Sequence, residues 1–169
     1  IESFFVKAND PSSARAVWLK VTCLRSTTDA PHRFDFWCCV FDDKLGRYLG
    51  GRTQVTLDPV VFNGTALSIR HGAFNVQFCL QKGAFLGVIT TPDGPLKIDI
   101  SWHQIDHVMG MGYSMFPHDW MLKGPLPKQK TITPIALAHF NGTLDLDGQR
   151  YELVNWLGCQ GHNWGRAHT

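Results

Sequence analysis

The sequence predicts an all-β fold: an antiparallel barrel or strongly curved sandwich of about ten strands, with little helix. Three observations lead to this prediction. Apolar and polar residues alternate with a period of two along most of the chain, as in strands that bury one face. Turn-forming residues separate these stretches at short intervals. Finally, no stretch longer than about ten residues combines helical apolar spacing with caps at both ends.

The first expected strand shows the alternation clearly, because Phe4 and Val6 alternate with Ser3, Phe5 and Lys7. Further strands are expected over residues 17–23, 34–41, 48–57, 67–71, 75–80, 84–90, 96–102, 135–145 and 151–156. The turns between them are Asn9-Asp10-Pro11, Asp42-Asp43-Lys44-Leu45-Gly46, Asn63-Gly64, Gln81-Lys82-Gly83, Pro92-Asp93-Gly94 and Asp147-Gly148.

Two glycine patterns lead to local predictions. Gly50 and Gly51, inside the expected 48–57 strand, predict a bulge or a sharp bend. Asn63 and Asn141 each begin an Asn-Gly-Thr sequon, which could carry a glycan in a secreted protein. Asn-Gly is also the strongest signal for a tight hairpin, so we expect turns at both positions.

Composition narrows the class of partner. With 169 residues, 44% of them hydrophobic and 18% charged, the chain suits a single domain with a substantial core. The formal net charge is +2, from 16 basic and 14 acidic residues spread along the chain, and no basic stripe suggests a nucleic-acid partner. No apolar run approaches the roughly 18 residues of a transmembrane segment.

The five cysteines are Cys23, Cys38, Cys39, Cys79 and Cys159. Their odd number, without a CxxC pair, predicts small buried apolar side chains and favours a reducing cytoplasm. Cys38 and Cys39 should point to opposite faces of one strand. Because the chain begins with Ile1 rather than Met, and because its last residues read as the middle of a segment, we expect both ends to be cut from a longer polypeptide.

Neither a metal site nor a cofactor is expected. His103 and His107 have the spacing of a helical zinc pair, but Gln104 stands where that motif needs a glutamate, and the context is a strand leading into a loop. The sequence also lacks a nucleophile elbow, a phosphate loop and a dinucleotide fingerprint.

The long stretch 103–133 is expected to be irregular, because it is rich in glycine and proline. It is also strongly apolar and holds all four methionines, which predicts that it packs over an opening or against a second lobe. Its large apolar residues are Met109, Met111, Tyr113, Met115, Phe116, Trp120, Met121 and Leu122.

The terminal segment Gly161-His162-Asn163-Trp164-Gly165 is the strongest candidate for chemistry. On a strand, His162 and Trp164 share one face and Asn163 lies on the other. A titratable imidazole beside an indole could protonate or polarise an apolar ligand, while the indole stabilises a developing cation. The alternative is a buried aromatic layer that contains a hydrogen-bonded histidine.

Four segments, in order from one end of the chain to the other, carry a resemblance to a known family. They are Glu2-Ser3-Phe4-Phe5-Val6-Lys7-Ala8-Asn9, Arg15-Ala16-Val17-Trp18-Leu19-Lys20-Val21-Thr22, the Trp37–Asp42 stretch Trp-Cys-Cys-Val-Phe-Asp, and the closing Trp156-x-Gly158-x-x-Gly161-His162-Asn163-Trp164-Gly165-x-x-His168. Together they resemble the lipocalin-like carotenoid 1,2-hydratase (hydroxyneurosporene synthase) superfamily.

The resemblance implies a pair of lipocalin-like lobes that hold an apolar ligand near their junction. This chain, residues 1–169, would be one domain, the N-terminal lobe. Family members include carotenoid hydratases and cyclases of the Diels–Alder type. A His-x-Trp of the hydratases' proposed acid machinery maps to His162 and Trp164, and its partner Tyr and Asp come from a later segment that this chain does not contain.

Three functions remain open on the sequence alone. The first is proton-assisted hydration, cyclisation or isomerisation of a polyene-like substrate, with His162 as the acid, Trp164 facing the cation and residues 109–121 as a lid. The second is a non-catalytic carrier of a lipid-like ligand. The third is a structural lobe that docks on a missing C-terminal domain. The residues expected to contact the ligand are Trp18, Trp37, Trp102, Met109, Met111, Tyr113, Met115 and Trp120.

Overall fold

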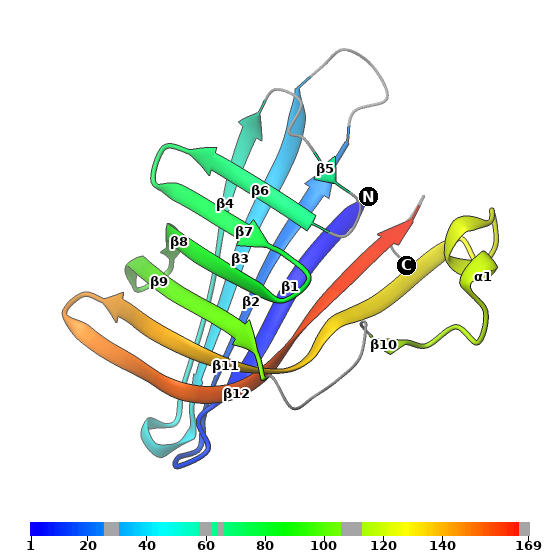
Figure 1. Cartoon of the computed structure of the whole chain (residues 1–169). Coiled ribbons are helices and arrows are strands. Elements are labelled where there is room, and N and C mark those ends of the chain that lie inside the picture. The colour runs from blue at the N-terminus through cyan, green and yellow to red at the C-terminus, as the bar shows by residue number, and fades with distance from the viewer. Residues whose placement is uncertain (26–30, 58–61, 64–65, 106–112, 166–169) are drawn as a thin grey trace.

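The computed structural model describes residues 1–25, 31–57, 62–63, 66–105 and 113–165, and it confirms an all-β fold. Its strands form one antiparallel sheet in the order β4-β3-β2-β1-β12-β11-β9-β8-β7-β6-β5, with β10 paired to β11 (Figure 1). Their bounds are β1 Glu2–Asn9, β2 Arg15–Leu24, β3 His32–Asp42, β4 Arg47–Leu57, β5 Phe62–Asn63, β6 Ala66–His71, β7 Phe74–Phe78, β8 Lys82–Thr91, β9 Gly94–Gln104, β10 Tyr113–Ser114, β11 Gln129–Leu146 and β12 Gln149–Gly165. Two short helices, η1 (Asp43–Leu45) and α1 (Asp119–Lys123), lie between strands.

The period-two pattern places apolar residues on one face of this curled sheet, which we call the inner face. Phe4, Val21 and Phe36 lie there in register across β1, β2 and β3, and each is fully buried. The same face of the crossing strands β7, β8 and β9 supplies Phe78, Phe85 and Trp102. The two groups of strands cross in Figure 1, so their inner faces pack together into a lipocalin-like half-barrel.

The sheet curls until β4 packs against β8. The backbone N–H of Thr90 donates to the Thr53 hydroxyl at 2.9 Å, which joins the two strands. A Cβ atom on Gly51 would stand 2.5 Å from the Thr90 carbonyl oxygen, so only glycine permits this approach. The β3–β4 register continues without interruption through Gly50 and Gly51, so the predicted bulge is wrong. Close packing explains Gly51 instead.

The long hairpin of β11 and β12 differs from the expectation in two ways. Strand β11 already begins at Gln129, inside the stretch expected to be irregular, and Pro134 fits there because the register shifts between Ile132 and Ile135. The expected turn at Asn141 is wrong: Asn141 lies within β11, at the register shift between Phe140 and Gly142. The turn expected at Asp147-Gly148 is confirmed, with both residues at positive φ.

Two further local predictions concern the adjacent cysteines and the first Asn-Gly turn. Cys38 is buried on the inner face and Cys39 is half-buried on the opposite face, as the alternation predicts. The turn expected at Asn63-Gly64 continues into residues 64–65, which lie outside the described residues. Within the described part of the chain, no helix has the length and apolar character needed to cross a bilayer.

Candidate active site

His162 lies on β12, where the alternation of that strand turns it to the inner face. It is directly opposite Phe4 of β1 and Ile132 of β11. Its side chain is only 3% exposed. Trp164 follows on the same face, opposite Glu2. The two residues that the sequence placed on one face therefore do share it, and Glu2 joins them.

Glu2 is the carboxylate partner of this histidine. His162 Nε2 stands 3.2 Å from Glu2 Oε1, and the second carboxylate oxygen, Oε2, accepts a hydrogen bond from the Arg25 guanidinium. Burial acts to raise the pKa of Glu2, but the hydrogen bond from His162 and the charge of Arg25 more than offset it, so its pKa lies below the ordinary 4.5. Glu2 is therefore ionised at neutral pH.

This arrangement determines which imidazole nitrogen can accept a proton. An ionised carboxylate only accepts hydrogen bonds, so His162 Nε2 carries the hydrogen that points to Glu2. In the neutral ring Nδ1 is then a bare acceptor. Nδ1 is buried and has no hydrogen-bond partner among the described residues. The site thus holds an oriented imidazole with one proton-accepting atom uncommitted.

Aromatic rings surround the imidazole. Phe4 stacks on His162 with ring centroids 4.1 Å apart, and Trp164 stacks on it at 4.8 Å. Phe4 in turn contacts Phe78, and Phe78 contacts Trp102. These rings pack around the imidazole, and the indole face would stabilise an imidazolium or a cationic ligand.

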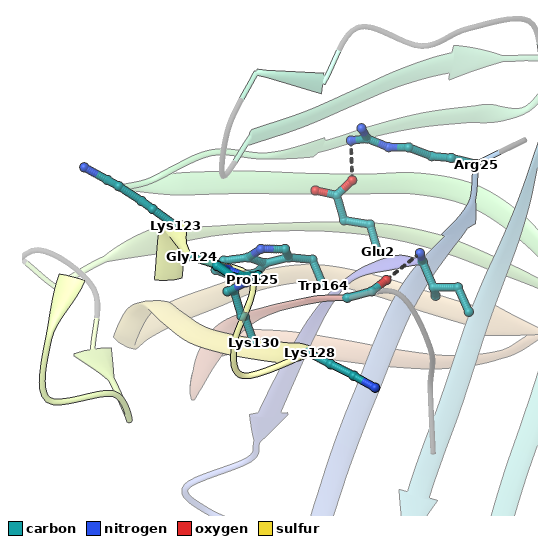
Figure 2. A pocket seen from close by; sticks show the side chains of 10 residues that line it. Glu2, Arg25, Lys123, Gly124, Pro125, Lys128, Lys130 and Trp164 are labelled. Carbon is teal, nitrogen blue, oxygen red and sulfur yellow. Dashed lines mark hydrogen bonds and ion pairs between the residues drawn. The ribbon is translucent and has the colours of Figure 1, made fainter. Parts of the chain in front are cut away.

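A cavity of about 450 Å³ opens beside this pair. Figure 2 shows Gly124 and Pro125 close to the Trp164 indole, and Glu2 and Arg25 joined to each other nearby. Lys123, Lys128 and Lys130 complete its charged lining. Glu2 and Trp164 both contact His162 and both line the cavity, so they connect the buried imidazole to a space where a ligand could bind.

The tryptophans expected to contact a ligand lie in different environments. Trp102 is packed in the core, where its indole N–H donates to Gln160 Oε1 at 2.7 Å, and it reaches His162 only through Phe78 and Phe4. Trp18 and Trp37 lie on the outer face, because their neighbours in sequence, such as Leu19 and Cys38, occupy the inner one.

The other expected contact residues lie in the segment before β11. Tyr113, Met115 and Trp120 are exposed in the structure. Met109 and Met111 lie outside the described residues. The part of this segment that reaches the site is instead Lys123 to Pro125, just after α1, which lines the cavity beside Trp164.

Sequence reasoning missed Glu2 and Arg25. Glu2 did leave a signal, since it falls on the face of the first strand that carries Phe4 and Val6, where a carboxylate needs a partner. Sequence reasoning also missed Gln160, which lies two residues before His162 on the same face of β12. Gln160 is fully buried, and its amide donates to the Cys79 carbonyl oxygen at 2.9 Å.

Comparison with known proteins shows likeness in fold. No family model matches the sequence, and no curated protein matches it. Among solved structures, the chain is similar to a candidate AttH protein from Nitrosomonas europaea, with a TM-score of 0.53 and 10% identity over 99% of this chain and 52% of that one. It is similar also to kievitone hydratase from Nectria haematococca, with a TM-score of 0.57 and 11% identity over 98% and 48% of the two chains.

The chain thus spans about half the length of each of these two structures. At 10% and 11% identity, the likeness shows the lipocalin-like fold alone.

Proposed function

We propose that this chain is a lipocalin-like lobe that binds an apolar small molecule and transfers a proton at His162. The observation that carries the proposal is the buried contact between His162 and Glu2, beside a cavity that Glu2 and Trp164 line. A carboxylate that orients an imidazole, together with an uncommitted ring nitrogen, is the arrangement of a general acid or base. The hydratase name of one structural neighbour supports the same class of chemistry.

The proposed reaction is proton-assisted hydration, cyclisation or isomerisation of a polyene-like substrate. The imidazolium of His162 gives the Nδ1 proton to one carbon of a double bond, which leaves a cation on the substrate. The indole face of Trp164 stabilises that cation. Water then adds and returns its proton to Nδ1, which completes a hydration. Attack by a second double bond followed by proton loss gives a cyclisation, and proton loss alone gives an isomerisation.

Deuterium exchange tests this proposal whichever of the three products forms. The full-length protein is incubated in D2O with retinol and with cis-parinaric acid, and the ligand mass is followed by mass spectrometry. Every proposed route passes through a proton transfer to carbon, so we expect carbon-bound deuterium that the ligand retains after its O–D group is exchanged back in H2O. In the His162→Gln variant the rate of deuterium incorporation should fall by about 10²- to 10⁴-fold, the usual size of general acid–base catalysis, while ligand binding survives.

His139→Gln is the matched control. His139 lies on the neighbouring strand β11, and its Nδ1 is also buried without a partner among the described residues. This variant should exchange deuterium at the wild-type rate. Undiminished exchange in His162→Gln, or no exchange by the wild type with either polyene, would contradict the proposal.

The filled inner face favours a second candidate, a structural lobe. The large buried side chains leave that interior packed with rings rather than open. The comparison structures, about twice as long as this chain, support a C-terminal partner lobe on which it would dock. The same experiment separates the candidates: ligand binding without exchange indicates a carrier, and neither binding nor exchange indicates a structural lobe.

A further inference from the structure

The cavity beside Trp164 is strongly cationic. Four of the side chains that line it carry positive charge, namely Arg25, Lys123, Lys128 and Lys130, and they share the cavity with one carboxylate, Glu2. In Figure 2 the side chains of Lys123 and Lys128 extend in opposite directions from the central indole. The four cationic side chains therefore line one cavity together with the Trp164 indole.

Glu2 does not neutralise the lysines. Its two oxygens are already engaged, Oε1 by His162 and Oε2 by Arg25. The Lys130 ammonium donates to the Gly124 carbonyl oxygen at 2.7 Å, which holds the ammonium at the cavity wall and leaves two of its hydrogens for another acceptor. Within the described part of the chain, none of the three lysines forms an ion pair with a carboxylate.

We infer that this cavity binds the anionic end of an otherwise apolar ligand, and this inference rests on the proposed function. A carboxylate, sulfate or phosphate would accept hydrogen bonds from Lys130 and its neighbours. The Trp164 indole would contact the adjoining apolar part of the molecule. Because Trp164 also stacks on His162, an anion held here places the apolar body of the ligand beside the proposed proton donor. The substrate class is thus an amphipathic acid rather than a neutral hydrocarbon.

A matched pair of fluorescent polyenes tests this inference. The acid, cis-parinaric acid, and its methyl ester share one apolar chain and differ in charge. Titrations of the full-length protein should show the acid binding about tenfold more tightly than the ester, which corresponds to about 1.4 kcal/mol. This advantage should shrink at high salt, because the cavity is open to solvent. Inorganic phosphate alone should compete with the acid and leave the binding of the ester unchanged.

Two variants remove charge from the cavity. Lys130→Met and Lys128→Gln should each weaken binding of the acid about three- to tenfold and leave that of the ester unchanged. Lys44→Gln is the control, because Lys44 is an exposed lysine in η1, next to the end of β3 farthest from Glu2. It should change neither affinity.

Equal affinity for acid and ester, or variants that weaken both alike, would overturn the anion site and leave the proposed function standing. An equal effect of Lys44→Gln on the acid would also overturn the site, because the preference would then reflect overall charge. If neither compound binds, both the anion site and the binding of polyenes are overturned.

Discussion

At the scale of single residues, Glu2 decides what His162 can do. The carboxylate orients the imidazole through Nε2 and so leaves Nδ1 as the proton-accepting atom. Its own charge is maintained by Arg25 and by the hydrogen bond from His162, against the cost of burial. A buried carboxylate with both oxygens engaged contributes to stability as well as to chemistry.

This role predicts a pH-dependent stability. The pKa of Glu2 in the folded protein lies below 4.5, so the unfolded chain binds its proton more readily. The stabilisation is therefore complete above about pH 4.5 and is lost as the pH falls through the folded pKa. Replacing Glu2 with Gln should lower the free energy of unfolding by about 1–3 kcal/mol at pH 7. The difference from wild type should narrow below about pH 4.5.

Thermal unfolding followed by circular dichroism between neutral and acidic pH measures this difference. The control is Glu152→Gln, which alters the only other glutamate of the chain, a residue whose side chain is 69% exposed. It should change stability little at any pH. A Glu2→Gln effect of constant size across this pH range would contradict the assignment.

At the scale of elements, local patterns predict the strands and non-local packing decides the exceptions. Alternation identifies which face of each strand is buried, because that property depends on neighbouring residues. The start of β11 could not be predicted in this way. Glycine and proline indicate irregular chain locally, but pairing of Lys130 and Ile132 with Trp164 and His162 extends the strand there.

Gly50 and Gly51 give a paired test of the β4–β8 contact. A Cβ atom on Gly51 would stand 2.5 Å from Thr90 O, whereas one on Gly50 meets only Cys39 Sγ, at 3.7 Å. Gly51→Ala should therefore cost about 1–3 kcal/mol through overpacking. Gly50→Ala should be neutral or slightly stabilising, because alanine restricts the unfolded chain.

Chemical denaturation of the two variants measures both changes under the same conditions. The expected order is Gly50→Ala at least as stable as wild type, and Gly51→Ala clearly less stable. Equal stability of the two variants would show that β8 does not approach β4 as closely as the structure places it.

At the scale of the whole molecule, the site exists because the curled sheet brings its first and last described strands together. Strands β1 and β12 lie side by side, so Glu2 and His162 are in contact although 160 positions separate them in sequence (Figure 1). Sequence reasoning could select His162 and Trp164 from their shared face. It could not identify their partner, because strand order depends on how the whole sheet closes.

The central claim is that Glu2 holds His162 with Nδ1 as the proton-accepting nitrogen. The most direct test is ¹H–¹⁵N NMR of the histidine side chains in the full-length protein at alkaline pH, where the imidazole is neutral, with His162 assigned from its loss in His162→Gln. We predict that Nε2 carries the proton, that Nδ1 shows the shift of an unprotonated nitrogen, and that Glu2→Gln perturbs this signal. A proton on Nδ1 of the neutral ring, or a spectrum of His162 unchanged by Glu2→Gln, would contradict the account.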